Sequence, residues 1–396
     1  MPLVTLADLH KPSVTQPNKK VYELVRLRID DAMRPMPPTS MLPAADKATL
    51  EQWLASSAPA GGSAEATCAS AMPSAPPPQE SLGRLTPRPG ETCYEFKVHG
   101  SYTSVDDTKF EMRPGELYEQ FYYNIPWPAG TVATSYATVP DNYKILHHWL
   151  LFSTVELQTQ GNHIEAPLPT LIGTDPVLIT GWALGGPPLT VNEADDLGFE
   201  LPDPGSRIIN VQWHFYNSTN TPQSDGSSIQ ICTVPRSTRK NIAAVSWLGT
   251  EDLNGNVWFG GAGMAAHQES TFSSTCVPGR RGLAAGDSIH IIGFEPHMHR
   301  IGKNMKTSVV RADGTMSTIF DKPFSFGNEA HYDVRYELKP GEKLLTSCTF
   351  NNTNNFGVPF GESSDSEMCY QFVLAYPAHA LSNGAFSLLG VTDSCW

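Results

Sequence analysis

The chain has 396 residues, of which 17% are charged, with 27 Lys and Arg against 40 Asp and Glu and a formal net charge of -13. This acidic balance repels nucleic acid and anionic membrane surfaces, so we expect neither as a partner. No run approaches the roughly eighteen apolar residues of a membrane span, and none is predicted. The 32 Gly and 33 Pro favour many short strands joined by turns, which predicts a mainly β protein.

The first part of the chain has a different character from the rest. Residues 1–58 contain KKVYELVRLRIDDAM and DKATLEQWLASS, both with the apolar spacing of amphipathic helices, and predict a small helical unit. Residues 59–89 are rich in Ala, Pro, Ser and Gly. They can bury too little apolar surface to offset the conformational entropy lost on folding. We therefore expect a linker there.

From residue 90 onward the helical period disappears. Segments such as KILHHWLLFSTVEL, SRIINVQWHFYN, SIHIIGFEP and CYQFVLAYP are punctuated by Gly, Pro and Asn, as in the strands of antiparallel sandwiches. About 300 residues exceed what one sandwich usually needs. The sequence therefore predicts two β-sandwich halves, residues 90–236 and 237–396.

Two histidines stand one residue apart in FEPHMHRIGKNM. On a strand, side chains at i and i+2 share a face, so His297 and His299 are expected to point the same way. Two packed imidazoles without a shared partner would each lose about 1–3 kcal/mol of hydrogen bonding, whereas a metal ion satisfies both. We expect the pair to bind a metal.

A second group of histidines lies in the first half. His147 and His148 are neighbours in ILHHWLLF, and His214 follows in VQWHFYN. Neighbours on a regular strand face opposite ways, so both reach one ion only through a local bulge or through different ring nitrogens. An all-imidazole site suits zinc, copper, iron or nickel, so these ligands leave the metal undecided.

The segment GESSDSEMCYQFVLAYP adds a soft ligand. Met368 precedes Cys369 at the start of a predicted strand, which puts the thioether and the thiol sulfur on opposite faces. A thioether beside His297 and His299 would favour Cu(I). The alternative is a methionine that merely fills a gap in the core.

These motifs, in the order HH, QWH, HMH and SSDSEMC, resemble those of the copper type II, ascorbate-dependent monooxygenases, which include the peptidylglycine and dopamine hydroxylating enzymes. The resemblance covers roughly residues 90–396. It implies two jelly-roll-like antiparallel β-sandwich subdomains, each with one copper. It also implies a small-molecule substrate, O₂, and ascorbate or another reductant or a partner electron-donor protein.

Carried over by position, the resemblance assigns a role to each ligand. His147, His148 and His214 match the ligands of an electron-donating copper. The catalytic copper, which binds dioxygen, matches His297, His299 and Met368. The implied electron transfer between the two ions crosses solvent.

Seven cysteines occur without any CxxC pair, which favours disulfides and an extracytoplasmic compartment, periplasmic or secreted. The start of the chain has no signal peptide, so we expect the sequence to begin after one. The resemblance implies the pairs Cys348–Cys369 and Cys276–Cys395. Cys93–Cys232 is a weaker third expectation, which leaves Cys68 in the linker.

The substrate is harder to predict. Peptide-amidating members of the family place an arginine where this chain has Glu295, and their substrate-gripping Asn and Tyr would fall at Tyr370 and Phe372. Peptide amidation is therefore not expected. Glu295 at the mouth of the site favours a cationic or hydroxyl-bearing substrate, although an exposed loop carboxylate is the alternative.

The N-terminal segment resembles the C-terminal half of a small c-type cytochrome, with Met36 in MPP at the position of an axial haem ligand. The chain contains no CxxCH, so covalent haem is not expected. Either a preceding segment carried the haem motif or this unit is a haem-free relic.

Together these features predict a dicopper monooxygenase that hydroxylates an activated C–H bond of a small organic substrate. The alternative is a copper-binding or electron-transfer protein without hydroxylase activity.

Overall fold

The computed structural model describes residues 9–12, 18–29, 44–57, 83–100, 105–155, 158, 160–161, 163–165, 175–183, 186–191, 195–205, 207–253, 263–327, 329–385 and 393–396. Within these ranges strands dominate, and the α-helices lie in the N-terminal segment. The predicted mainly β class with a small helical segment is confirmed.

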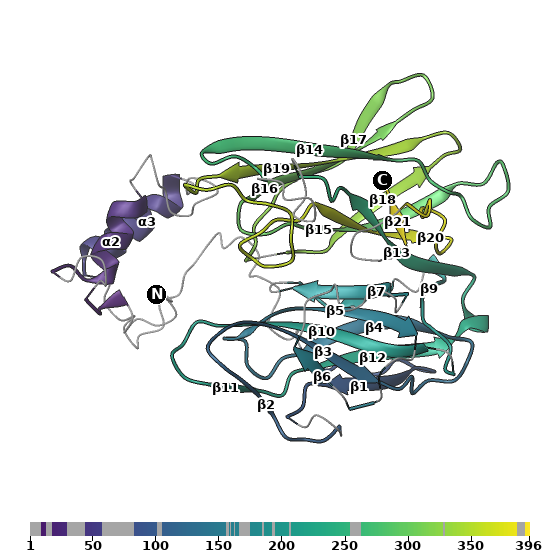
Figure 1. Cartoon of the computed structure of the whole chain (residues 1–396), viewed down its shortest axis with the longest axis horizontal. Coiled ribbons are helices and arrows are strands. Elements are labelled where there is room, and N and C mark those ends of the chain that lie inside the picture. Colours follow the sequence, from purple (N-terminus) through teal and green to yellow (C-terminus); the bar gives the residue numbers. More distant parts are fainter. Residues whose placement is uncertain are drawn as a thin grey trace. The chain divides into compact units, whose positions relative to one another are not determined.

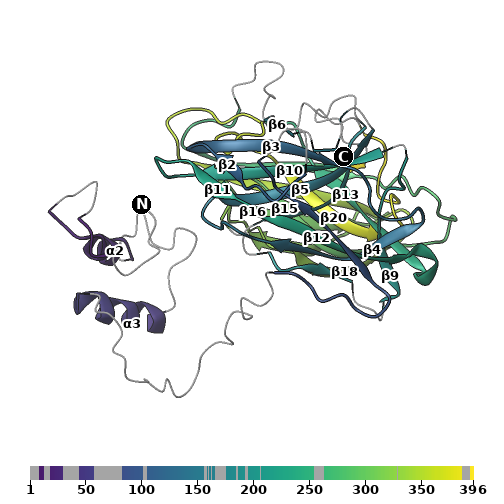
Figure 2. The same ribbon diagram turned by 90° about the horizontal axis from the view of Figure 1, so that it is seen from below.

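The chain divides into two compact units, residues 1–75 and 76–396. In the first unit, helices α2 (Val21–Ile29) and α3 (Ala44–Ala55) pack side by side (Figure 2). Ile29 and Leu54 form the centre of their contact, because the apolar spacing places both on inward faces. Met36, Cys68 and most of the predicted linker lie outside the described residues.

The first sandwich of the second unit is built from two sheets, with a short two-stranded ribbon beside them. One sheet has the order β1 (Thr92–Lys97), β12 (Ser228–Pro235), β4 (Thr131–Val139) and β9 (Leu197–Glu200), with β8 (Leu189–Thr190) paired to β4. The other has the order β6 (His163–Glu165), β3 (Gly115–Tyr123), β10 (Arg207–Asn217), β5 (Leu146–Val155) and β7 (Val177–Ala183). The ribbon is β2 (Phe110–Met112) with β11 (Gln223–Asp225).

The second sandwich repeats this plan. Its first sheet has the order β13 (Asn241–Gly249), β20 (Tyr370–Tyr376), β15 (Ile289–His297) and β18 (Tyr332–Leu338), with β21 (Ser394–Cys395) paired to β13. Its second sheet has the order β14 (Gln268–Cys276), β19 (Lys343–Asn352), β16 (Gly302–Val310) and β17 (Met316–Pro323).

The two sandwiches share one sheet. β9 pairs with β13 in parallel over three residues, so a continuous ladder runs from β1 to β18. Figure 1 shows the second sandwich above the first, with β7 beside β13. The turn η4 (Arg236–Thr238) lies between them, where the sequence predicts the boundary at 236/237. Their status as separate domains stays a prediction.

Three disulfides link the strands of this unit, and all three expected pairs are bonded. Cys93–Cys232 joins the neighbouring strands β1 and β12, and Cys276–Cys395 ties β14 to the terminal strand β21. Cys348–Cys369 connects β19 to the residue that precedes β20. Both cysteines of this last pair are fully buried between the two sheets of the second sandwich.

An ion-pair cluster also joins the two sandwiches. The imidazole of His379 contacts the carboxylate of Glu200 in β9 through Nε2 and that of Asp393 through Nδ1. These two hydrogen bonds, Asp393 first, raise the pKa of His379 from its ordinary value of 6.5 to about 10, against the opposing effect of burial. His379 is therefore a cation at neutral pH.

The His379 cluster predicts a pH dependence of stability. Because the folded-state pKa is raised, the stabilisation is complete below about pH 6.5 and is lost as the pH rises towards 10. The side chain is 35% exposed, so solvent screening limits the effect to about 1–2 kcal/mol. We expect His379→Gln to lower the free energy of unfolding by this amount at pH 6, and by less at pH 10. Denaturant titrations should show no such pH trend for His267→Gln, because its partner among the described residues is neutral: Nε2 of His267 contacts the amide oxygen of Asn355.

Candidate metal centre

A β-bulge brings the three histidines of the first sandwich together. His148 of β5 lies opposite His214 of β10, but the next pair is Phe215 with Leu146, so His147 is the extra residue of a bulge. The bulge turns the side chain of His147 towards that of His148, as neighbours on a regular strand could not do. Strand geometry allows either a bulge or the use of different ring nitrogens for both imidazoles to reach one ion, and the structure has the bulge.

The three imidazoles converge through the same ring nitrogen. Nδ1 of His148 lies 3.1 Å from Nδ1 of His147 and 3.4 Å from Nδ1 of His214. Two metal–nitrogen bonds of about 2 Å can span separations of this size, so these atoms could hold one ion. Candidate ligand atoms of all three residues lie within 4.8 Å of one another. The residues therefore fit a metal ion.

Electrostatics keep these rings able to bind a cation. Burial, with His214 and His297 adding repulsion, lowers the pKa of His147 to about 3. Burial likewise lowers the pKa of His148 well below its ordinary value. Neutral imidazoles offer nitrogen lone pairs, so the cluster is prepared for a metal rather than for protons.

A carboxylate orients His214. Nε2 of His214 lies 2.8 Å from Oε1 of Glu116 in β3, which leaves Nδ1 for the cluster. Burial tends to raise the pKa of Glu116, but hydrogen bonds from His214 and Ser364 outweigh it and bring the pKa to about 2. Glu116 is thus an ionised carboxylate behind a candidate metal ligand, and such an arrangement fixes the tautomer and ring orientation of metal-binding histidines in metalloproteins.

The second pair of histidines is oriented in the opposite way. Nδ1 of His297 lies 2.8 Å from Oε2 of Glu329, and Nδ1 of His299 lies 3.0 Å from the carbonyl oxygen of Ser366. Both rings therefore keep Nε2 for another partner. Their ring centroids are 5.2 Å apart.

Met368 and His299 lie just beyond the paired strands of this sheet. The last pair of the ladder is His297 of β15 with Tyr370 of β20, and His299 and Met368 each lie two residues past it. Met368 is 3% exposed. The following residue, Cys369, bonds to Cys348 of β19 and so points to the other side of the sheet, as the alternation predicts.

The two histidine clusters adjoin in this structure. The ring centroids of His148 and His297 are 5.9 Å apart, and the ring of Phe326 contacts both His147, at 4.5 Å, and His299, at 6.0 Å. The resemblance implies two ions that exchange an electron across solvent. The arrangement here differs, because imidazoles of the two clusters are near neighbours.

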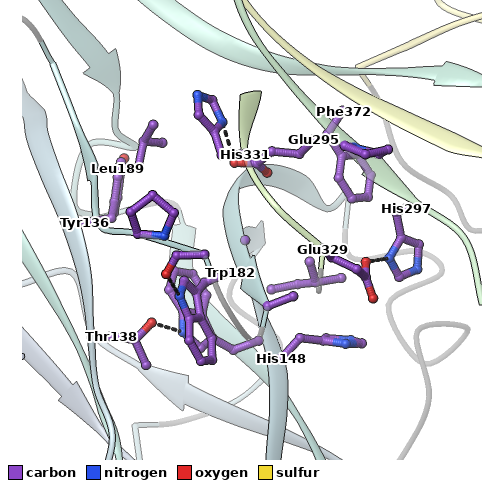
Figure 3. Close-up of a pocket in the computed structure, with 17 residues that line it drawn as sticks. Tyr136, Thr138, His148, Trp182, Leu189, Glu295, His297, Glu329, His331 and Phe372 are labelled. Atoms are coloured by element: carbon purple, nitrogen blue, oxygen red, sulfur yellow. Dashed lines mark hydrogen bonds and ion pairs between the residues drawn. The ribbon is translucent and has the colours of Figure 1, made fainter. Parts of the chain in front are cut away.

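A pocket lies beside both clusters (Figure 3). Its wall combines His148 and Trp182 of the first sandwich with residues of the second. Glu295 lines the pocket, and its Oε1 lies 3.0 Å from Nδ1 of His331. Its role in substrate binding stays a prediction. The lining is largely aromatic or apolar with a few polar groups: Tyr136, Thr138, His148, Trp149, Leu150, Gly181, Trp182, Ala183, Gly186, Pro187, Leu189, Glu295, Pro296, His297, Glu329, His331 and Phe372.

The other two predicted substrate contacts have different outcomes. Phe372 lines the pocket, with its ring stacked at 5.8 Å from His297. Tyr370 is fully buried, does not line the pocket, and donates its hydroxyl to Glu251 at 2.8 Å. Tyr370 packs edge-on against Trp247 in the core, and its contact with a substrate stays a prediction.

Several residues near the site could not be identified from the sequence. Glu116 and Phe326 lie outside the sequence motifs described above, and so does Trp182, which belongs to the edge strand β7. The segment NEAHY contains a carboxylate and an imidazole two residues apart, Glu329 and His331. This spacing is a sequence feature that could have indicated a functional role for the two residues. Burial raises the pKa of Glu329, although the contact with His297 opposes that rise.

Among the described residues, no helix is long and apolar enough to cross a membrane.

Comparison with protein families matches residues 262–386 to the C-terminal domain of the copper type II ascorbate-dependent monooxygenases. This finding supports that family for the chain. The matched segment contains His297, His299 and Met368, and the family's description names copper and ascorbate.

Curated relatives agree with the family. The chain is 27% identical over 261 residues to mouse DBH-like monooxygenase protein 2, covering 62% of this chain and 40% of that protein. It is 25% identical over 256 residues to human dopamine beta-hydroxylase, covering 60% and 39%. The chain thus spans about two fifths of the length of these relatives. Among solved structures, N-glycanase F aligns with a TM-score of 0.28 at 8% identity over 72% of this chain and 95% of that one. A likeness this weak supports no conclusion about fold or function.

Proposed function

We propose that this chain is a copper-dependent monooxygenase that hydroxylates an activated C–H bond of a small organic substrate, with O₂ and ascorbate or another external reductant. One copper would bind Nδ1 of His147, His148 and His214. The other would bind Nε2 of His297 and His299 with the sulfur of Met368. The observation that supports this proposal most strongly is the presence of two imidazole clusters beside one pocket. In His214, His297 and His299 a hydrogen bond occupies one ring nitrogen and leaves the other for a metal ion.

The different ligand sets support a division of labour. When bound, copper supplies dioxygen activation and one-electron transfer, chemistry that amino-acid side chains do not provide. Three imidazoles accommodate both oxidation states, whereas a weak thioether favours the cuprous form. His297, His299 and Met368 are therefore proposed to form the catalytic site, and the three-histidine cluster to supply electrons.

The protein residues prepare the site for this chemistry. Glu116 holds His214 in the orientation that directs Nδ1 to the cluster. The rings of Trp182 and Phe372 line the pocket beside His148 and His297 and offer apolar surface to a substrate. The three disulfides fit an oxidising, extracytoplasmic compartment.

The pocket also bears on the substrate. The Glu295–His331 pair at its wall offers a carboxylate instead of the arginine of peptide-amidating enzymes, so a cationic or hydroxyl-bearing substrate is favoured. Peptide amidation is not proposed, because an acid cannot hold the terminal carboxylate of a peptide.

Copper content and oxygen uptake test this proposal together. The protein should retain two equivalents of copper per chain and, with ascorbate, consume O₂ in proportion to hydroxylated product. A panel of small amines should react faster than uncharged analogues of the same size. Two retained equivalents without substrate-dependent uptake would support the electron-transfer alternative, and fewer than two would contradict the dicopper site. Equal rates across the panel would remove Glu295 from substrate binding.

A further inference from the structure

Glu329 makes a contact that the proposed ligand set does not explain. Its Oε2 lies 2.8 Å from Nδ1 of His297, and the two side chains are 7% and 10% exposed. Its other oxygen, Oε1, is buried without a hydrogen-bond partner among the described residues. Figure 3 shows the carboxylate directed at the imidazole from the pocket wall.

This contact decides which nitrogen of His297 can bind a metal. A carboxylate accepts but does not donate when ionised, so Nδ1 carries the proton and Nε2 keeps its lone pair. The hydrogen bond also fixes the rotation of the ring. His299 has a neutral acceptor in the same place, the carbonyl of Ser366, so only one of the two imidazoles is backed by a charge.

The ionised form of Glu329 is stabilised by a nearby positive charge, because burial alone favours its neutral form. A buried carboxylate with one unpaired oxygen is costly, and such groups persist where they are paired or near a metal. In the part of the chain that the structure describes, His297 is the ion-pair partner of Glu329. A cation on Nε2 draws electron density from the ring and strengthens the bond from Nδ1–H to the carboxylate.

We propose that Glu329 is a positioning residue for the catalytic metal site: it holds His297 as an Nε2 ligand and balances the charge of the bound ion. This inference rests on the proposed function, since it assumes that His297 binds copper. It adds a charged residue behind one ligand of that site, as Glu116 lies behind His214 in the other.

Glu329→Gln tests the charge while it preserves the shape and an acceptor oxygen. Loss of such a supporting group typically weakens metal binding about 10- to 100-fold. Titration of Cu(I) against a competing chelator should therefore show this loss for one of two equivalents and leave the other unchanged. The Cu(II) electron paramagnetic resonance signal of the weakened site should shift. Glu295→Gln is the matched control, because it removes a pocket carboxylate that contacts His331 instead and should keep both affinities.

The outcomes separate the two levels of the proposal. A wild-type chain that binds fewer than two equivalents overturns the proposed function itself. If wild type and Glu329→Gln both bind two equivalents with equal affinities, the positioning role is wrong and the proposed function stands. Nitrogen-15 spectra of the Cu(I)-loaded wild type give a check that needs no variant: a proton on Nδ1 of His297 supports the inference, and a metal on Nδ1 overturns it.

Discussion

His148→Ala is expected to remove one of the two copper equivalents and to lower substrate-coupled oxygen uptake by at least about 100-fold. Nδ1 of His148 is the central donor, 3.1 Å and 3.4 Å from those of His147 and His214, so its loss leaves two imidazoles that no longer enclose an ion. Removal of a direct ligand should exceed the effect of about 10- to 100-fold that follows loss of an outer hydrogen-bond partner. Metal analysis after dialysis and an oxygen electrode measure both results.

A buried histidine outside the cluster provides the control for this variant. His163 of β6 lies in the same sheet, and its ring stacks on Phe121 at 4.9 Å. His163→Ala should reduce stability, because it leaves a cavity, but it should keep two equivalents of copper. If His148→Ala also keeps two equivalents with unchanged affinity, the three-histidine site is wrong.

The segment before Met368 contacts both clusters. The hydroxyl of Ser364 donates to Glu116, whose carboxylate holds His214 of the first cluster. Two residues later, the carbonyl of Ser366 accepts from His299 of the second. One short stretch of chain therefore contacts Glu116 behind the first cluster and His299 of the second, and so links the two clusters.

The local parts of the site could be predicted from the sequence. A histidine pair at i and i+2, a histidine doublet in a strand and a methionine beside a cysteine each have geometric consequences that depend on strand alternation alone. For both histidines of the doublet to reach one ion, strand geometry demands either a bulge or the use of different ring nitrogens. The structure has a bulge at His147. The two-sandwich plan followed in the same way from strand and turn patterns.

The supporting residues could not be predicted, because they meet the ligands only through tertiary structure. Glu116 and His214 are separated by 98 residues, and Ser364 and Glu116 by 248. No periodicity connects positions so distant. The parallel pairing of β9 with β13 was also beyond prediction, because a three-residue edge contact leaves no pattern of its own. The haem-like interpretation of Met36 stays a prediction.

Removal of the Cys348–Cys369 disulfide, by Cys348→Ala with Cys369→Ala, is expected to lower the free energy of unfolding by about 3 kcal/mol. The cross-link spans 21 residues, and a loop of this length restricts the unfolded chain by roughly that amount in the loop-entropy model. Because Cys369 adjoins Met368, we also expect weaker binding of the copper at His297 and His299, measured by chelator competition. The matched control is Cys93→Ala with Cys232→Ala, which opens a link with a sequence separation of 139 in the first sandwich and should cost about 5 kcal/mol in the same model. That control should leave the affinity of the Met368 site unchanged in the folded protein, so equal losses of copper affinity in both double variants would show that the disulfide acts on stability alone and does not position the thioether.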